Sequence, residues 1–136
     1  MNMSNLLGNQ RNINLKGERT MISINNTSRE LTKKETYKMT LAPAIQKLSL
    51  AKGSIIAVDA YCSYSDEKID TKTGELVTVN ILSIMDKDGT VYATNSASFQ
   101  KDFRNICVIM DGEEFEIEVI SGISKNGREY ITCTLV

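Results

Sequence analysis

Tyrosines and cations on or beside strand-like runs are the residues of this chain that could do chemistry. The tyrosines on alternating runs are Tyr61, Tyr64, Tyr92 and Tyr130. The cations in or beside the intervening polar turns are Lys68, Lys72, Lys87, Lys125 and Arg128. Nucleic-acid bases stack on aromatic rings without regard to sequence, while lysine and arginine follow the phosphates. The pattern is therefore typical of a protein that binds a single nucleic-acid strand.

Each of these residues also has a simpler interpretation. A tyrosine on a strand can bury its ring and keep only its hydroxyl at the rim. A lone surface lysine is usually solubilising. Asp59, Asp66 and Glu67 lie close to the candidate residues and weaken phosphate binding, so we expect modest affinity with a steep dependence on salt. The sequence leaves both interpretations open.

Catalytic and metal chemistry have few residues to draw on. The chain has no histidine, so the commonest general base is missing. The run Asp86-Lys87-Asp88-Gly89 lacks the distal glutamate of a calcium loop. Gly122 and Gly127 have P-loop spacing, but no Lys-Ser/Thr pair follows them. We therefore expect a non-enzymatic protein with no metal site and no cofactor.

The three cysteines predict reduced thiols. The chain has an odd number of cysteines, and none of them has Cys-x-x-Cys spacing. All three fall at positions patterned as apolar: Cys62, Cys107 and Cys133. Buried thiols are favoured over a bridge or a metal site. No apolar run approaches the ~18 residues that cross a bilayer, and Met1 to Gln10 lack the order of a signal peptide. We expect a cytoplasmic protein without a membrane segment.

Three strands come first among the elements that must position these residues. Period-two alternation predicts strands over 54–65, 75–86 and 90–94, joined by a polar loop at 66–74 and a tight turn at 87–89. Within the first strand, the same face is expected to carry Ile56, Val58, Ala60 and Cys62. A shift in the pattern near Leu82-Ser83 suggests a bulge or strong coiling.

A helix and a closing hairpin follow. Ser96 or Ser98 can cap a helix that runs to Met110 and ends at Asp111-Gly112, and phenylalanines occupy its core-facing positions. Residues 115–136 alternate on both sides of Asn126-Gly127, a pair that favours a type I′ turn. The order β-β-β-α-β-β is that of the OB fold, a five-stranded Greek-key barrel. In OB folds the outer face of strands two and three binds oligonucleotides or oligosaccharides between two loops, here 66–74 and 122–128.

The N-terminal part differs in composition. Residues 1–53 carry nine Lys or Arg against three Glu, whereas residues 54–136 carry seven against fourteen acids. We expect residues 1–36 to form a flexible, Asn-rich basic arm and residues 37–136 to form the barrel domain. The arm could contact a polyanion, dock on its own body or a neighbour, or only add solubility. Pro43 can begin a short helix that Gly53 ends, or the segment 38–42 can be extended.

Three stretches together resemble a known family. They are Asp88-Gly89-Thr90-Val91-Tyr92, the helix at 96–110, and the run 115–136 with Ser124-Lys125-Asn126-Gly127-Arg128. They resemble the single-stranded DNA-binding proteins of small tailed bacteriophages, including those that replicate by protein priming, over 37–136. The resemblance implies DNA contacts at Tyr61, Tyr92, Lys125, Arg128 and Tyr130. It also implies action in the host bacterial cytoplasm beside other phage replication proteins, and leaves open whether the protein is a monomer or a homo-oligomer.

The leading hypothesis is a protein that coats and protects single-stranded DNA intermediates of phage replication through aromatic stacking and Lys/Arg–phosphate contacts. The alternative is a protein-interaction module on the same barrel, a replication accessory or host-takeover inhibitor with no direct role on nucleic acid.

Overall fold

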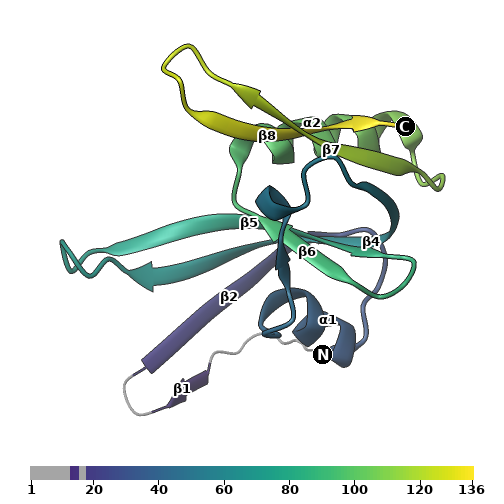
Figure 1. Cartoon of the computed structure of the whole chain (residues 1–136). Helices are drawn as coiled ribbons and strands as arrows, with labels where there is room; N and C mark the ends of the chain where they lie inside the picture. The colour runs from purple at the N-terminus through teal and green to yellow at the C-terminus, as the bar shows by residue number, and fades with distance from the viewer. Residues whose placement is uncertain (1–12, 16–17) are drawn as a thin grey trace.

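The protein is mostly β, with a strongly curled sheet and two α-helices among the described residues (Figure 1). A computed structural model describes residues 13–15 and 18–136, with side chains from residue 22. In chain order the elements are β1 (Ile13–Leu15), β2 (Glu18–Thr27), α1 (Lys33–Thr40), β3 (Gln46–Lys47), the 3₁₀ turn η1 (Leu48–Leu50), β4 (Ile55–Ile69), β5 (Leu76–Asp86), β6 (Val91–Thr94), α2 (Ala97–Met110), β7 (Glu116–Ile123) and β8 (Glu129–Leu135). From β4 onward the order is the predicted β-β-β-α-β-β.

Strand β4 holds the two parts of the sheet together. It pairs antiparallel with β5 along most of its length, and its first residues, 55–57, pair with β7. Strands β5 and β6 form one antiparallel pair, and β7 and β8 form another. No pairing of β6 with β8 is present in the described part of the chain. The Ser98 hydroxyl instead donates to the Ile131 carbonyl at 2.9 Å, so a closed ring of five strands is not confirmed.

The main core lies between the curled sheet and α2. Ser96 caps this helix by accepting from the Phe99 backbone N–H at 3.2 Å, and Asp111 ends it in the left-handed region with φ of 48°. Phe99 and Phe103 are buried, as the spacing predicted. The buried residues of this core are Leu48, Ile56, Val58, Leu82, Ile84, Phe99, Phe103, Ile117, Val119, Ile131 and Cys133.

A bulge in β4 divides its side chains between two cores. Val58 pairs with Asp86 and Ala60 with Met85, which leaves Asp59 as an extra residue. An inserted residue shifts the alternation, so side chains beyond it face the other way. Ile56 and Val58 therefore face the main core, while Ala60 and Cys62 join a second cluster. The prediction that all four share a face is wrong.

The second cluster lies under α1, on the outer face of β4, β5 and β6. It contains Met39, Ala60, Cys62, Tyr64, Met85 and Val91. Residues 82–85 of β5 are consequently buried on both faces. The register of β4 and β5 runs without a break from Ala60/Met85 to Ile69/Leu76. The pattern shift at Leu82-Ser83 thus reflects two-sided burial. Of the two alternatives predicted there, a bulge or strong coiling, the bulge is wrong.

Part of the expected N-terminal arm forms regular structure. Residues 21–27 of β2 pair antiparallel with residues 62–67 of β4. Helix α1 begins with a capping box, in which Thr32 accepts from the Glu35 N–H and Glu35 accepts from the Thr32 N–H. The boundary expected at residue 36 falls inside this helix. The first twelve residues of the expected arm lie outside the described residues, and the division into an arm and a domain stays a prediction.

The expected helix after Pro43 is wrong. Only the three-residue turn η1 forms there, and α1 lies earlier because its capping box is at Thr32. The chain leaves α1 at Leu41, two residues before Pro43, which disfavours helical angles at the residue before it.

The turn of the closing hairpin also differs from the prediction. Gly127 has φ of 79°, whereas Asn126 is not among the residues with positive φ. The Gly127 N–H donates to the Ser124 carbonyl, and the Ser124 N–H donates to the Arg128 carbonyl. A type I′ turn needs positive φ at both central residues, so the predicted turn type is wrong although the hairpin is confirmed.

The cysteines are free thiols, as predicted: Cys62 and Cys133 are buried and Cys107 is partly buried. Across residues 13–15 and 18–136, no helix is long and apolar enough to cross a membrane.

Candidate nucleic-acid interface

A groove runs between the β4–β5 hairpin and the beginning of β8. Figure 1 shows the β4–β5 and β7–β8 hairpins projecting from the same side of the molecule. The groove has a volume of about 840 Å³. Val79, Ile81 and Ala93 give it an apolar lining. Its polar and aromatic lining includes Lys47, Lys52, Tyr64, Lys68, Glu129 and Tyr130.

Tyr130 is the exposed aromatic residue of this groove, with 42% of its surface accessible. It stands opposite Gly122 in the β7–β8 pair. A Cβ atom on Gly122 would lie 2.6 Å from Tyr130 Cζ, closer than real contacts allow. The missing side chain of Gly122 therefore lets the tyrosine ring lie against the strand while one side of it stays open.

Two lysines that the sequence reasoning missed also line the groove. Lys52 Nζ lies 2.6 Å from a carboxylate oxygen of Glu129. Lys47 is positioned by the short parallel pairing of β3 with β6, in which it lies opposite Ala93. Both lysines precede the barrel strands in the chain, so spacing gave no indication of their place. The excess of basic residues over 1–53 was the only signal for them.

Tyr64 is a structural residue of this groove. It is 3% exposed, and its hydroxyl donates to the Thr40 carbonyl at 3.3 Å. The buried Ser83 hydroxyl donates to the Met39 carbonyl at 2.5 Å. Both carbonyls belong to the last turn of α1. The carbonyls of a helix's last turn receive no hydrogen bond from within the helix, so these two side chains supply the missing donors. Burial raises the pKa of Tyr64, in agreement with a ring that is closed off from solvent.

Tyr61 and Tyr92 do not line the groove, and both pack against the main core. The Tyr61 ring meets Phe103 edge-on, with 5.2 Å between centroids. Burial, with a smaller contribution from Cys107, raises the pKa of Tyr61 to about 12, and burial also raises that of Tyr92. Tyr61 lines a separate hollow of about 320 Å³ together with Lys87, which lies 3.4 Å from Glu114.

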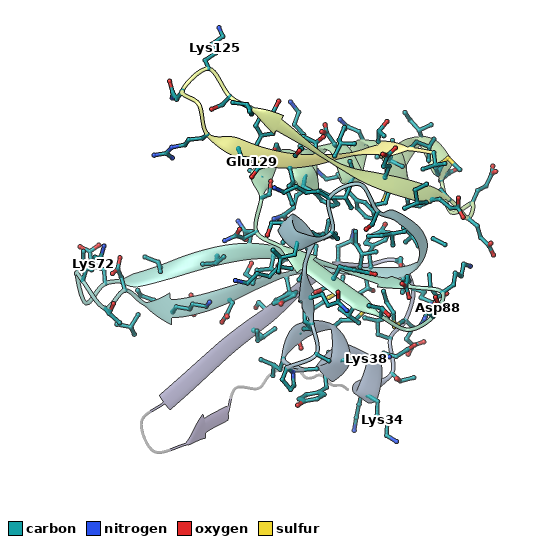
Figure 2. The ribbon with its side chains drawn as sticks, in the orientation of Figure 1. Lys34, Lys38, Lys72, Asp88, Lys125 and Glu129 are labelled. Atoms are coloured by element: carbon teal, nitrogen blue, oxygen red, sulfur yellow. The ribbon has the colours of Figure 1, made fainter. Side chains whose placement is uncertain are left out.

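Of the remaining predicted cations, Lys68 lines the groove, whereas Lys72, Lys125 and Arg128 lie in or beside the turns of the two hairpins. Lys68 Nζ lies 3.9 Å from Asp66. Lys72 and Lys125 stand at the ends of the two projecting hairpins (Figure 2). Arg128 is exposed at the end of the β7–β8 turn. The structure thus brings Tyr130 and Lys68 together in one groove, with cations at both tips, and leaves Tyr61, Tyr92 and Lys87 outside its lining.

This arrangement offers stacking and phosphate contacts. In the described part of the chain, no three His, Cys, Asp or Glu side chains gather as metal ligands would. No curated protein and no solved structure matches the chain. One family model, of the Phi29 type and described as phage single-stranded DNA-binding protein, matches residues 21–136.

Proposed function

Because the chain belongs to this family of phage single-stranded DNA-binding proteins, we propose that it binds single-stranded DNA in the groove and coats replication intermediates. By holding the strand extended, it protects the DNA and removes secondary structure. Other phage replication proteins are its expected neighbours at the fork.

The observation that carries the proposal is an exposed tyrosine in a groove lined by lysines. A base stacks on Tyr130, which is 42% exposed. Lys47, Lys52 and Lys68 surround the same groove and contact the phosphates. The apolar floor accepts sugar and base edges. Lys72 and Lys125 at the tips lengthen the path on which phosphates are attracted.

The proposal also assigns the fold to the OB class. The groove lies over β5 and β6 and opens between the β4–β5 and β7–β8 turns, which is where OB barrels bind oligonucleotides. The hydroxyl of Ser98, in the first turn of α2, donates to the Ile131 carbonyl of β8, so the helix covers β8 on the side where the described residues show no pairing with β6. We therefore regard the sheet as an OB barrel that is open on this side.

Titration of labelled oligo-dT at two salt concentrations tests the function. Tyr130→Ala is expected to weaken binding about 5- to 140-fold, since stacking contributes ~1–3 kcal/mol per base. Tyr130→Phe keeps the ring and is expected to bind nearly as well as the wild type. Lys101→Ala, on the exposed face of α2, is the control. Absence of binding at low salt, or equal affinity for double strands, would refute the proposal.

The double variant Lys125→Glu/Arg128→Glu separates this function from the rival protein-interaction module. Reversed charge at a hairpin tip repels phosphates, so DNA affinity falls under the proposal. A module without a role on DNA would show unchanged DNA titrations.

A further inference from the structure

The outer face of α1 carries an exposed tyrosine between lysines. Tyr37 is 55% exposed, more than Tyr130 at 42%. Lys33, Lys34, Tyr37 and Lys38 line a shallow hollow of about 480 Å³, and we call these four residues the α1 patch. Figure 2 shows Lys34 pointing away from the body of the protein.

Helical spacing explains how the patch forms. Lys33 and Lys34 precede Tyr37 by four and three residues, so they share its face of the helix. Met39 lies on the opposite face and is fully buried in the second cluster. Tyr37 belongs to neither cluster of buried residues among those described. Its ring is therefore free of a core role and open to a ligand.

The lysines of the patch form no direct ion pair among the residues whose side chains are described. Within residues 22–136 no ion pair joins Lys33, Lys34 or Lys38 to a carboxylate. Glu35, the one acid of α1, is held by Arg29 at 3.0 Å. The hydrogen bond from Arg29, followed by that from the Thr32 N–H, lowers the pKa of Glu35 to about 2.

Arg29 also lies 3.3 Å from Asp59. The Arg29 guanidinium therefore pairs with both carboxylates, and neither of them pairs with a lysine of the α1 patch.

The patch adjoins the groove. Ala42 lines both the groove and the hollow beside Tyr37. On the other side of the patch, Lys38 reaches the turn between β5 and β6, where its Nζ lies 3.0 Å from the position of a Cβ on Gly89. A strand that leaves the groove past Leu41 and Ala42 thus meets Tyr37 and the lysines next.

We propose that the α1 patch is a second contact surface for single-stranded DNA. Tyr37 stacks one base outside the groove, and Lys33, Lys34 and Lys38 bind the phosphates on either side. This proposal rests on the proposed function, and it makes the DNA-binding site longer than the groove.

The test compares oligo-dT of two lengths at a series of salt concentrations. The triple variant Lys33→Ala/Lys34→Ala/Lys38→Ala is expected to reduce the slope of log K against log salt by about 2 on a ~30-mer, at about 0.7 per phosphate contact. Tyr37→Ala is expected to weaken binding of the ~30-mer about fivefold or more. An oligomer of about six nucleotides, which fills the groove alone, is expected to bind all variants as it binds the wild type.

Two controls keep these results interpretable. Alanine is a strong helix former, so the triple variant keeps α1, which circular dichroism and the thermal midpoint verify. Lys101→Ala/Arg104→Ala removes charge from the exposed face of α2 and is expected to leave the binding of the ~30-mer far less affected.

The outcomes separate this proposal from the function on which it rests. Wild-type protein that binds neither oligomer overturns the proposed function. Wild-type protein that binds both, with the patch variants unchanged on the ~30-mer, overturns the second surface alone. An equal loss on both oligomers also overturns it, because the patch would then not be a separate contact.

Discussion

Glu129 is an acidic residue inside a groove proposed to bind phosphate. Its carboxylate lies 2.6 Å from Lys52 Nζ, and the two side chains are 57% and 39% exposed. Exposed ion pairs contribute only ~0–1 kcal/mol to stability. In the absence of DNA, the pair holds Lys52 in place and offsets its charge. A phosphate entering the groove must compete with this carboxylate for the lysine.

Glu129→Gln is therefore expected to raise the affinity for oligo-dT several-fold at low salt and to leave the thermal midpoint nearly unchanged. Fluorescence anisotropy and thermal unfolding measure the two quantities. Glu114→Gln is the matched control, since Glu114 pairs with Lys87 at 3.4 Å outside the groove. Affinity that stays the same or falls in the Glu129 variant would show that Lys52 does not contact phosphate.

Gly122 determines where the Tyr130 ring lies. A Cβ at this position would lie 2.6 Å from both Cζ and the hydroxyl oxygen of Tyr130. The far end of a side chain can swing away at modest cost, so Gly122→Ala is expected to move the ring and change stability little. DNA affinity should then fall towards that of Tyr130→Ala.

A double-mutant cycle checks this coupling. In the Tyr130→Ala background, Gly122→Ala is expected to have almost no further effect on DNA affinity. Additive losses would contradict the assignment of Tyr130 as the stacking residue that Gly122 positions.

At the scale of elements, α1 is held at both ends by side chains. Thr32 and Glu35 close its first turn. At its last turn, Ser83 and Tyr64 of the underlying strands donate to the Met39 and Thr40 carbonyls. The helix is thereby fixed on the outer face of β5, and one end of the groove is fixed with it.

Ser83→Ala and Tyr64→Phe each remove one of these donors and leave a carbonyl without a partner. Each is expected to lower the free energy of unfolding by ~1–3 kcal/mol, measured by urea denaturation. Tyr64→Phe is expected to keep most DNA affinity, because the buried ring does not stack a base. A large loss of DNA binding by a stably folded Tyr64→Phe protein would contradict this.

Helix α1 should also weaken at low pH. The pKa of Glu35 falls from its ordinary 4.5 to about 2 because Arg29 and the Thr32 N–H bind the ionised form. A carboxyl whose folded pKa is depressed contributes stability above its unfolded pKa, and this contribution is lost as pH falls from about 4.5 to about 2. Glu35→Gln is expected to flatten the stability profile in that range, measured as thermal midpoint against pH. Glu113→Gln, at an exposed acid after α2, should not.

Local sequence patterns predicted the strands and the helix that depend on contacts between residues close in the chain. Alternation predicted β4 through β8, and capping with apolar spacing predicted α2. Asp59 and Tyr64 show why other features were missed. The bulge at Asp59 directs the β4 side chains beyond it into the other core. No residue type in the sequence indicates a bulge at this position. Tyr64 is buried because α1 covers it from 24 residues earlier in the chain, and α1 itself buries only Met39.

At the scale of the whole molecule, the net charge is only −1, but cations and acids gather in different parts of the surface. Cations from residues 33–52 line the groove, as Lys47 and Lys52 do, or form the α1 patch. Three acids, Asp59, Glu113 and Glu114, line the separate hollow beside Tyr61, against two cations, Arg29 and Lys87. Such a division orients a polyanion before contact and makes the rate of association depend on salt.

The distribution of the tyrosines has an optical consequence. The chain has five tyrosines and no tryptophan, so tyrosine alone dominates its emission near 300 nm. Tyr61, Tyr64 and Tyr92 emit from within or against the cores, while Tyr37 and Tyr130 emit from the surface. Quenching by DNA should therefore come almost wholly from the two exposed rings. Tyr130→Phe and Tyr37→Phe would divide the quenching between groove and α1 patch, and the signal that remains in the double variant would report folding alone.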